Sequence, residues 1–458
     1  IGLLRAFHHP HSQLRKPLFA IGGDRHRVDA NFTGEETNNE PIYIESGDHV
    51  RDRPPGFFRN QHHLRCGGRL SNVRKSFLPE PIAGLSGHFF EVLCLDRQFR
   101  LCGTGSDGQY RQQNNQESKR PSRLQNREKL DQHTGDAVDI LSDIFLNSTF
   151  DPVEMDRERQ VILQEINMLE DTPDEQVHVL FNRFFWLGHP LGMPIMGTPT
   201  TVSAMNRQTA LDHIRRFYTS GRIIVAAAGN VDHDSLVRYL QPLFESLPAA
   251  TEDPVRTAPG SHFGVSCHPK DLEQVHLCLG GNGPHLSSDL RFGGAVLNAI
   301  LGGNMSSRLF QEIREKRGLA HNVFSFVSSY IDVGMLGIYV ATDPKEANRA
   351  LKVIKKEIRK IQKGDVSKAD LEETLEHLTG GILLGSENTD TRMIRLAKNE
   401  GIFGRYISYE EVVADLQKVT VDQVVEVALQ AFDKDSVSLV TLGPLKSDEL
   451  DHNNVFFG

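Results

Sequence analysis

The alternation of apolar and polar residues changes character near residue 130 of this 458-residue chain. Downstream, segments with a helical or a strand period follow one another, separated by Gly, Pro, Asn and Asp. Upstream, neither period persists for long, and Arg greatly outnumbers Lys. The pattern therefore predicts alternating helices and strands from about residue 135 onward and assigns no regular structure to residues 1–130.

Three helices are predicted at the start of the patterned region. Residues 136–146 place apolar side chains on one helical face. Asp151 and Pro152 begin a long helix, because proline is favoured in the first turn. Residues 171–174 (Asp-Thr-Pro-Asp) interrupt that helix, and another follows through Phe185.

A helix followed by a buried strand occurs twice along the chain. A helix begun by Thr209 precedes the apolar run 222–228, and a helix begun by Thr420 precedes the apolar run 437–443. Residues 248–259, rich in Pro, Ala and Thr, have the composition of a linker. We therefore predict an α/β (α+β) fold of two homologous domains, each a mixed β-sheet flanked by helices, in a clamshell arrangement. A chance recurrence of a common helix–strand unit is the alternative.

The predicted domain limits follow from the linker. They are an amino-terminal domain at 1–247, a linker at 248–260, a carboxy-terminal domain at 261–447 and a tail at 448–458.

Composition narrows the class of protein. A net charge of −9 argues against a nucleic-acid partner, which usually requires a basic patch. No apolar run approaches the ~20 residues that would span a membrane. The five cysteines are an odd number without a C-x-x-C pair, which is typical of reduced thiols. We therefore expect a cytoplasmic protein, with the periplasm as the alternative.

Two short patterns contain residues that could carry chemistry. Glu158 and Glu165 are seven residues apart on the predicted helix, so they project from the same face two turns apart. His88 and Glu91 have the spacing of the inverted zinc motif H-x-x-E-H, but Val92 occupies the position of the second His. Taken alone, the carboxylates are better explained as a solvated face, and the His-x-x-Glu spacing as a chance pairing.

A resemblance changes the weight of both patterns. Residues from about 135 to 445 resemble the pitrilysin/insulinase family of zinc metallopeptidases, most closely its bacterial, mitochondrial-processing-peptidase-like branch. The segments that carry the resemblance are DAVDILSDIFLNSTFDP (136–152), DRERQVILQEINMLEDTPDE (156–175), GHPLGMPIMGT (188–198) and LGGNMSSRLFQEIREKRGLAHNVFSF (301–326).

The resemblance implies a zinc site and assigns a role to each residue. His88 and Glu165 correspond to zinc ligands, Glu91 to the general base and Glu158 to an acid that supports catalysis. In a working family member the bound Zn²⁺ lowers the pKa of its water, and the base accepts that water's proton. Val92 departs from the family pattern and removes a nitrogen donor. His62, His63 or Cys66 could replace it, but no spacing supports this, and polar loop residues are the favoured interpretation.

The second domain is expected to bind the substrate. The family uses an Arg, and a Tyr seven residues later, to hold the peptide; the matching positions are Arg314 and His321. Gly302 and Gly303 match the family's glycine-rich substrate loop, although a simple turn before a helix near Ser306 explains them equally well. The peptide would bind as an added strand.

The departure at the front of the chain suggests a reading-frame change. Residues 107–111 (Asp-Gly-Gln-Tyr-Arg) stand where the family has Met-Asp-Ser-Ile-Gly. The nucleotide string GAT GGA CAG TAT CGG encodes the first peptide, and the same string read from its second base encodes the second. We hypothesise that part of residues 1–128 is out of frame. Divergence in an inactive subunit is the competing explanation.

Together these patterns predict a zinc-dependent metalloendopeptidase, a hydrolase that acts on peptides or processes proteins. The alternative is a catalytically inactive family member that binds peptides or serves as a scaffolding partner. A third interpretation is a gene product that does not fold. The expected partners are a peptide or protein substrate and a second family member in a homo- or heterodimer, with no nucleic acid and no membrane span.

Overall fold

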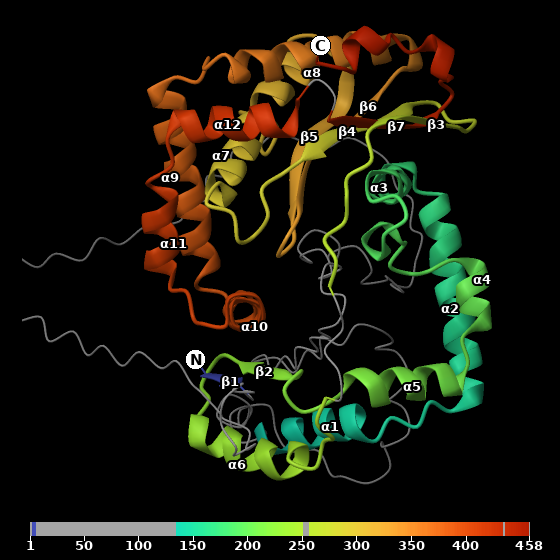
Figure 1. Ribbon diagram of the computed structural model, residues 1–458, viewed down its shortest axis with the longest axis vertical. Helices are drawn as coiled ribbons and strands as arrows, with labels where there is room; N and C mark the ends of the chain where they lie inside the picture. The colour runs from blue at the N-terminus through green and yellow to red at the C-terminus, as the bar shows by residue number, and fades with distance from the viewer. Residues whose placement is uncertain (1, 6–133, 251–255, 434–435, 458) are drawn as a thin grey trace, which may run out of the picture. The chain divides into compact units, whose positions relative to one another are not determined.

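A computed structural model describes residues 2–5, 134–250, 256–433 and 436–457 (Figure 1). Helices and strands both occur in these ranges, with a five-stranded mixed sheet after the linker, so the α+β class predicted from the sequence is confirmed. The predicted domain limits and the clamshell arrangement remain predictions.

The elements that precede the linker are mostly helical. β1 pairs antiparallel with β2, whose four residues are all buried, and α1 and α6 pack against β2. These elements are β1 (Gly2–Arg5), α1 (Thr134–Leu146), α2 (Pro152–Glu170), α3 (Pro173–Phe185), the 3₁₀ turn η2 (Pro190–Gly192), α4 (Pro199–Ala204), α5 (Arg207–Phe217), β2 (Ile224–Ala227) and α6 (His233–Phe244).

The capping residues explain where these helices begin. Asp151 caps α2 as predicted, because its carboxylate accepts hydrogen bonds from the amides of Val153 and Glu154 at 2.9 and 3.2 Å. The predicted start of α5 at Thr209 is wrong. Asn206 is the N-cap, and its side chain accepts a hydrogen bond from the Thr209 amide at 3.1 Å.

The residues after the linker form one five-stranded sheet in the order β3-β7-β4-β6-β5. β3 and β7 are parallel, and the other neighbours are antiparallel. The strands are β3 (Gly264–Pro269), β4 (Val275–Asn282), β5 (Ala320–Ser329), β6 (Gly334–Thr342) and β7 (Val437–Gly443). β5 and β3 are therefore the edge strands.

Helices and short turns complete this half. They are α7 (Arg291–Leu301), the π-helix η3 (Phe310–Glu315), η4 (Pro344–Glu346), α8 (Ala347–Gln362), α9 (Lys368–Gly385), α10 (Thr389–Phe403), α11 (Tyr409–Leu416), α12 (Val421–Ala431), η5 (Ser447–Glu449) and η6 (His452–Asn454). Thr420 caps α12 as predicted, through a capping box with Gln423.

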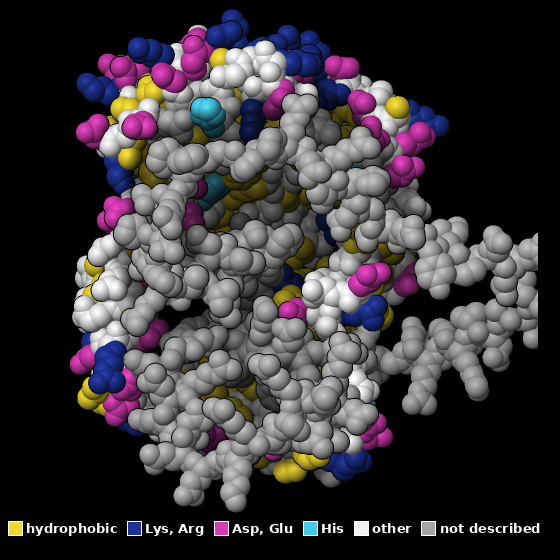
Figure 2. Space-filling model, turned by 180° about the vertical axis from the view of Figure 1, so that it is seen from behind, with side chains coloured by type: hydrophobic (Ala, Val, Ile, Leu, Met, Phe, Trp, Pro, Cys, Tyr) yellow, Lys and Arg dark blue, Asp and Glu magenta, His cyan; other side chains and the backbone are white. Residues whose placement is uncertain are grey.

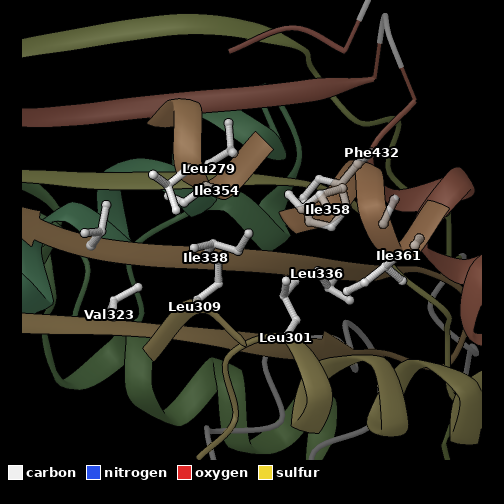
Figure 3. Close-up of a cluster of buried hydrophobic side chains, with 14 of the residues drawn as sticks. Leu279, Leu301, Leu309, Val323, Leu336, Ile338, Ile354, Ile358, Ile361 and Phe432 are labelled. Atoms are coloured by element: carbon white, nitrogen blue, oxygen red, sulfur yellow. The ribbon is translucent and has the colours of Figure 1, made fainter. Parts of the chain in front are cut away.

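Both faces of the sheet are covered, which explains why β6 is a continuous apolar run. Alternate residues of β6, such as Leu336 and Ile338, pack on one side in a large core with α7, α8 and α12 (Figure 3). Met335 and Tyr339 face the other side, where they meet Phe181 and Phe185 of α3. α3 thus joins the elements before the linker to the sheet after it.

Candidate functional site

α2 carries both carboxylates that the sequence singled out. Glu165 is exposed and Glu158 is partly exposed. Within the described ranges neither has an ion pair or a hydrogen-bonded partner, whereas neighbouring Arg157 and Arg159 pair with other acids of the same helix. The two candidate acids therefore have no partner among the described residues.

His88, Glu91 and Val92 lie outside the described residues, so the predicted approach of His88 to Glu165 stays a prediction. The donor chemistry can be judged from the side chains themselves. His88 and Glu165 offer lone pairs to zinc, but Val92 offers none. In the part of the chain that the structure describes, no three His, Cys, Asp or Glu side chains lie where they could hold a metal ion. His88 and Glu165 alone do not fit a catalytic zinc site, because such a site ordinarily has three protein ligands.

Arg314 lies on the π-helix η3, and its neighbours leave its guanidinium exposed. Its Cζ lies 4.8 Å from the centroid of the Phe310 ring, and its Nε lies 3.8 Å from Glu315. The other acid of the turn, Glu312, is already engaged. Hydrogen bonds from Lys316, at 2.6 Å, and from Arg317 hold the pKa of Glu312 at about 2. π-helical turns are frequent at functional sites.

His321 lies at an irregularity in the edge strand β5. The register with β6 shifts between Ala320 and Asn322, so His321 is the extra residue of a β-bulge. Its side chain is exposed, as is that of Asn322. A bulge at an edge strand re-aims a side chain away from the regular ladder, and here it presents the imidazole to solvent.

The glycine turn after α7 packs directly on β5. The Gly302 carbonyl accepts a hydrogen bond from the Ser325 amide at 3.1 Å, and a Cβ at Gly302 would lie 2.4 Å from that amide nitrogen. Ser325 Oγ donates to Asn298 Oδ1 at 2.8 Å. A Cβ at Gly303 would lie 3.0 Å from the Ala299 Cα. The glycines therefore have a packing role, and the helix expected near Ser306 begins a few residues later.

The structure brings Arg314, His321 and the two glycines to one edge of the sheet. They belong to η3, to β5 and to the turn that is bonded to β5, with only residues 316–319 between η3 and β5. The carboxylates of Glu158 and Glu165 belong to α2, which is linked to the sheet through α3.

A buried polar cluster that the sequence patterns did not predict lies between α3 and the sheet. His178 stacks on Tyr339 with 5.3 Å between ring centroids, and its Nδ1 lies 3.7 Å from Cys278 Sγ. Burial lowers the pKa of His178 to about 4, an effect that Asp174 partly opposes. His276 Nδ1 and the Tyr339 hydroxyl are 2.9 Å apart. The spacing of His178 between Val177 and Phe181 on an apolar helical face was the available signal.

Two family models match the chain. The model described as insulinase (peptidase family M16) matches residues 126–199, and the model described as peptidase M16 inactive domain matches residues 204–378. The chain is 35% identical over 306 residues to the uncharacterized zinc protease YmxG of Bacillus subtilis (strain 168), covering 67% of this chain and 75% of that protein.

Solved structures share the fold. The peptidase M16 inactive domain from Pseudomonas fluorescens superposes with a TM-score of 0.60 at 19% identity, over 67% of this chain and 74% of that one. A chain of complex III2 from Candida albicans, solved with Inz-5 bound, superposes with a TM-score of 0.62 at 18% identity, over 70% and 79%. The sheet-and-helix arrangement is thus that of M16 peptidase domains. The chain belongs to the insulinase family, peptidase family M16, and the predicted resemblance is confirmed.

Among the helices that the structure describes, none combines the length and the apolar character that a membrane crossing requires.

Proposed function

We propose that this chain binds extended peptides at the amino-terminal end of β5. The observation that supports the proposal is the direction of the backbone groups on the outer edge of β5. The Ser325 amide points away from β6, toward Gly302, and residues two apart on a strand point the same way. The Val323 amide and carbonyl therefore face away from β6 as well, and because Val323 is only 4% exposed, a peptide must displace what covers this part of the edge. A peptide can pair with them as an added strand.

Arg314 and His321 supply the polar contacts at this end of the strand. An exposed guanidinium donates to a peptide carbonyl or to a terminal carboxylate, and a neutral imidazole donates through one ring nitrogen. The glycine turn occupies the Ser325 amide, so the added strand is limited to the segment before Ser325. Binding is expected to be sequence-tolerant, because main-chain hydrogen bonds recognise any extended peptide.

The test is titration of a fluorescent extended peptide into the full chain, read as anisotropy. We expect Arg314→Ala to weaken binding by about ten-fold, the effect of losing a charge-assisted hydrogen bond. The control is Arg215→Ala, because Arg215 is also an exposed arginine paired with an acid of its own helix. Equal binding by the wild type and both variants would contradict the proposal.

A second candidate is zinc-dependent peptide hydrolysis, which the free carboxylates of Glu158 and Glu165 favour. The relative from Bacillus subtilis is named a zinc protease. This chain has Glu158 and Glu165 on α2, at the positions that the resemblance assigns to the family's acids. His88, Glu91 and Glu165 would act in that reaction, and the ligand missing at Val92 would have to come from elsewhere.

Metal analysis combined with cleavage of a quenched peptide separates the two candidates. Close to one zinc ion per chain, with cleavage that a chelator abolishes and Glu165→Gln removes, would establish the peptidase. Peptide binding without zinc and without cleavage would establish the binding protein.

The complex III neighbour also motivates a role as a subunit beside a second family member, which co-purification with an active M16 peptidase would test.

A further inference from the structure

The outer face of α8 carries a line of positive charge that peptide binding at β5 does not use. Five basic residues recur at intervals of three and four along the helix and its C-cap, so they form one straight row. At 1.5 Å per residue the row is about 21 Å long. We call it the basic stripe; its members are Arg349, Lys352, Lys356, Arg359 and Lys363.

The stripe is rigidly mounted. The opposite face of α8 is buried in the large core through residues such as Leu351, Ile354 and Ile358. Lys355, beside the stripe, donates from Nζ to the Asn453 carbonyl at 2.6 Å, which ties the helix to η6. Because its apolar side is occupied, α8 has no face to insert into a lipid layer, and only its charges are available.

Part of this charge has no ion-pair partner among the described residues, whereas Arg349 and Arg359 are already engaged. Lys352 and Lys356 are exposed and have no ion pair among the described residues. Arg349 pairs with Glu346 at 3.2 Å. The single acid of α8, Glu357, is buried and binds Lys360 at 2.8 Å. In Figure 2, Lys and Arg side chains lie among Asp and Glu side chains at the upper end of the molecule, where Figure 1 places α8.

The flanks of the stripe restrict the shape of an anionic partner. On one side lie η5 and η6, held to α8 by the bond from Asn348 Nδ2 to the Glu449 carbonyl at 2.8 Å, and they expose Asp448 and Asp451. On the other side α12 exposes Glu426. A broad anionic surface would meet these acids together with exposed Lys446, whereas a narrow partner laid along α8 would meet mainly the basic stripe.

We propose that the basic stripe binds an acidic α-helix of a partner protein, which packs lengthwise along α8. The intervals of three and four are those that a second helix repeats, so its Glu or Asp side chains can face Lys352, Lys356 and Lys363, which have no ion pair among the described residues. The whole chain carries a net charge of −9, which does not favour a nucleic acid as the partner. The proposal is independent of the peptide site at β5.

The test uses the full chain and two fluorescent, alanine-based helical peptides of identical composition. One peptide has Glu at intervals of three and four on one face, and the other distributes the same Glu residues around the helix. We expect the striped peptide to bind about ten-fold more tightly at low salt and to be released by added salt. Equal affinity for the two peptides would overturn the proposal. So would tighter binding of duplex DNA or of vesicles of phosphatidylcholine and phosphatidylglycerol.

A charge-reversal pair locates the binding. The double variant K352E/K356E should lose about ten-fold or more in affinity for the striped peptide. The control is K368E/K418E, which reverses two exposed lysines that pair with acids of their own segments at 3.7 and 2.9 Å. Identical losses in the two double variants would overturn the assignment to α8. Thermal melting of each variant verifies that the fold is kept.

Discussion

α2 and β5 each carry candidate functional residues, but they are built differently. On α2 the carboxylates of Glu158 and Glu165 project from a helix with one buried residue, Ile166. On β5 the candidate residues border a strand whose neighbours fill a packed core on both faces of the sheet. The packed core therefore fixes the position of β5 and of the residues beside it. The position of the acids on α2 relative to other functional groups is not fixed by a comparable core.

The largest expected effect tests the packing on which the edge depends. Phe432→Ala removes a fully buried ring from the core beneath the sheet and should lower the free energy of unfolding by about 3–5 kcal/mol. Met168→Ala on α2, where the side chain is 63% exposed, should change it by less than about 0.5 kcal/mol. Denaturant unfolding measures both, and similar values would break the contrast between the two regions.

The junction between the regions should be sensitive to acid through His178. The folded protein binds a proton on this imidazole only near pH 4, while the unfolded chain does so near its ordinary pKa of 6.5. Stability from this group is therefore complete above pH 6.5 and is lost as the pH falls toward 4, by about 3 kcal/mol in all.

His178→Phe should flatten that part of the pH dependence of unfolding. His377→Phe, at an exposed position on α9, is the matched control and should leave the wild-type slope. An unchanged slope in the His178 variant would show that α3 does not keep this imidazole buried.

Two glycine substitutions test the close packing of the Gly302 turn on β5. Gly302→Ala would place a Cβ 2.4 Å from the Ser325 amide nitrogen and should cost about 1–3 kcal/mol of stability, with weaker peptide binding. Gly380→Ala meets nothing within 4 Å in the middle of α9 and should stabilise the protein by up to about 1 kcal/mol. Effects of the same sign in both variants would contradict the packing role of Gly302.

The smallest predicted effect compares the two helix–strand units. Thr420→Ala removes the N-cap of α12 and should cost about 1 kcal/mol. Thr209→Ala should cost only a few tenths, because Asn206 is the cap of α5. Thermal melts of the two variants measure both losses of stability. A larger loss for Thr209→Ala would indicate that Thr209 caps the helix, as the sequence predicted.

Much of the fold could be predicted from local patterns. The caps at Asp151 and Thr420 and the buried runs of β2 and β7 are signals within a few residues, and the structure confirms them. The start of α5 was missed because Asn206 and Thr209 are both good caps, and the first of them is used.

The site was less predictable, because it depends on contacts between distant segments. The packing of Gly302 on Ser325 and the burial of His178 against β4 and β6 require the sheet to be assembled. The bulge at His321 depends on its register with β6. The pairing of His88 with Glu165 concerns residues partly outside the described ranges and remains a prediction.

Hydrogen exchange of the full chain, measured by mass spectrometry with and without a saturating extended peptide, tests the peptide edge most directly. We expect the peptide to slow exchange in the segment 320–324, at the Val323 amide above all, and to leave the Ser325 amide unchanged because Gly302 already binds it. Unaltered exchange across 320–324 under saturating peptide would contradict the assignment of peptide binding to β5.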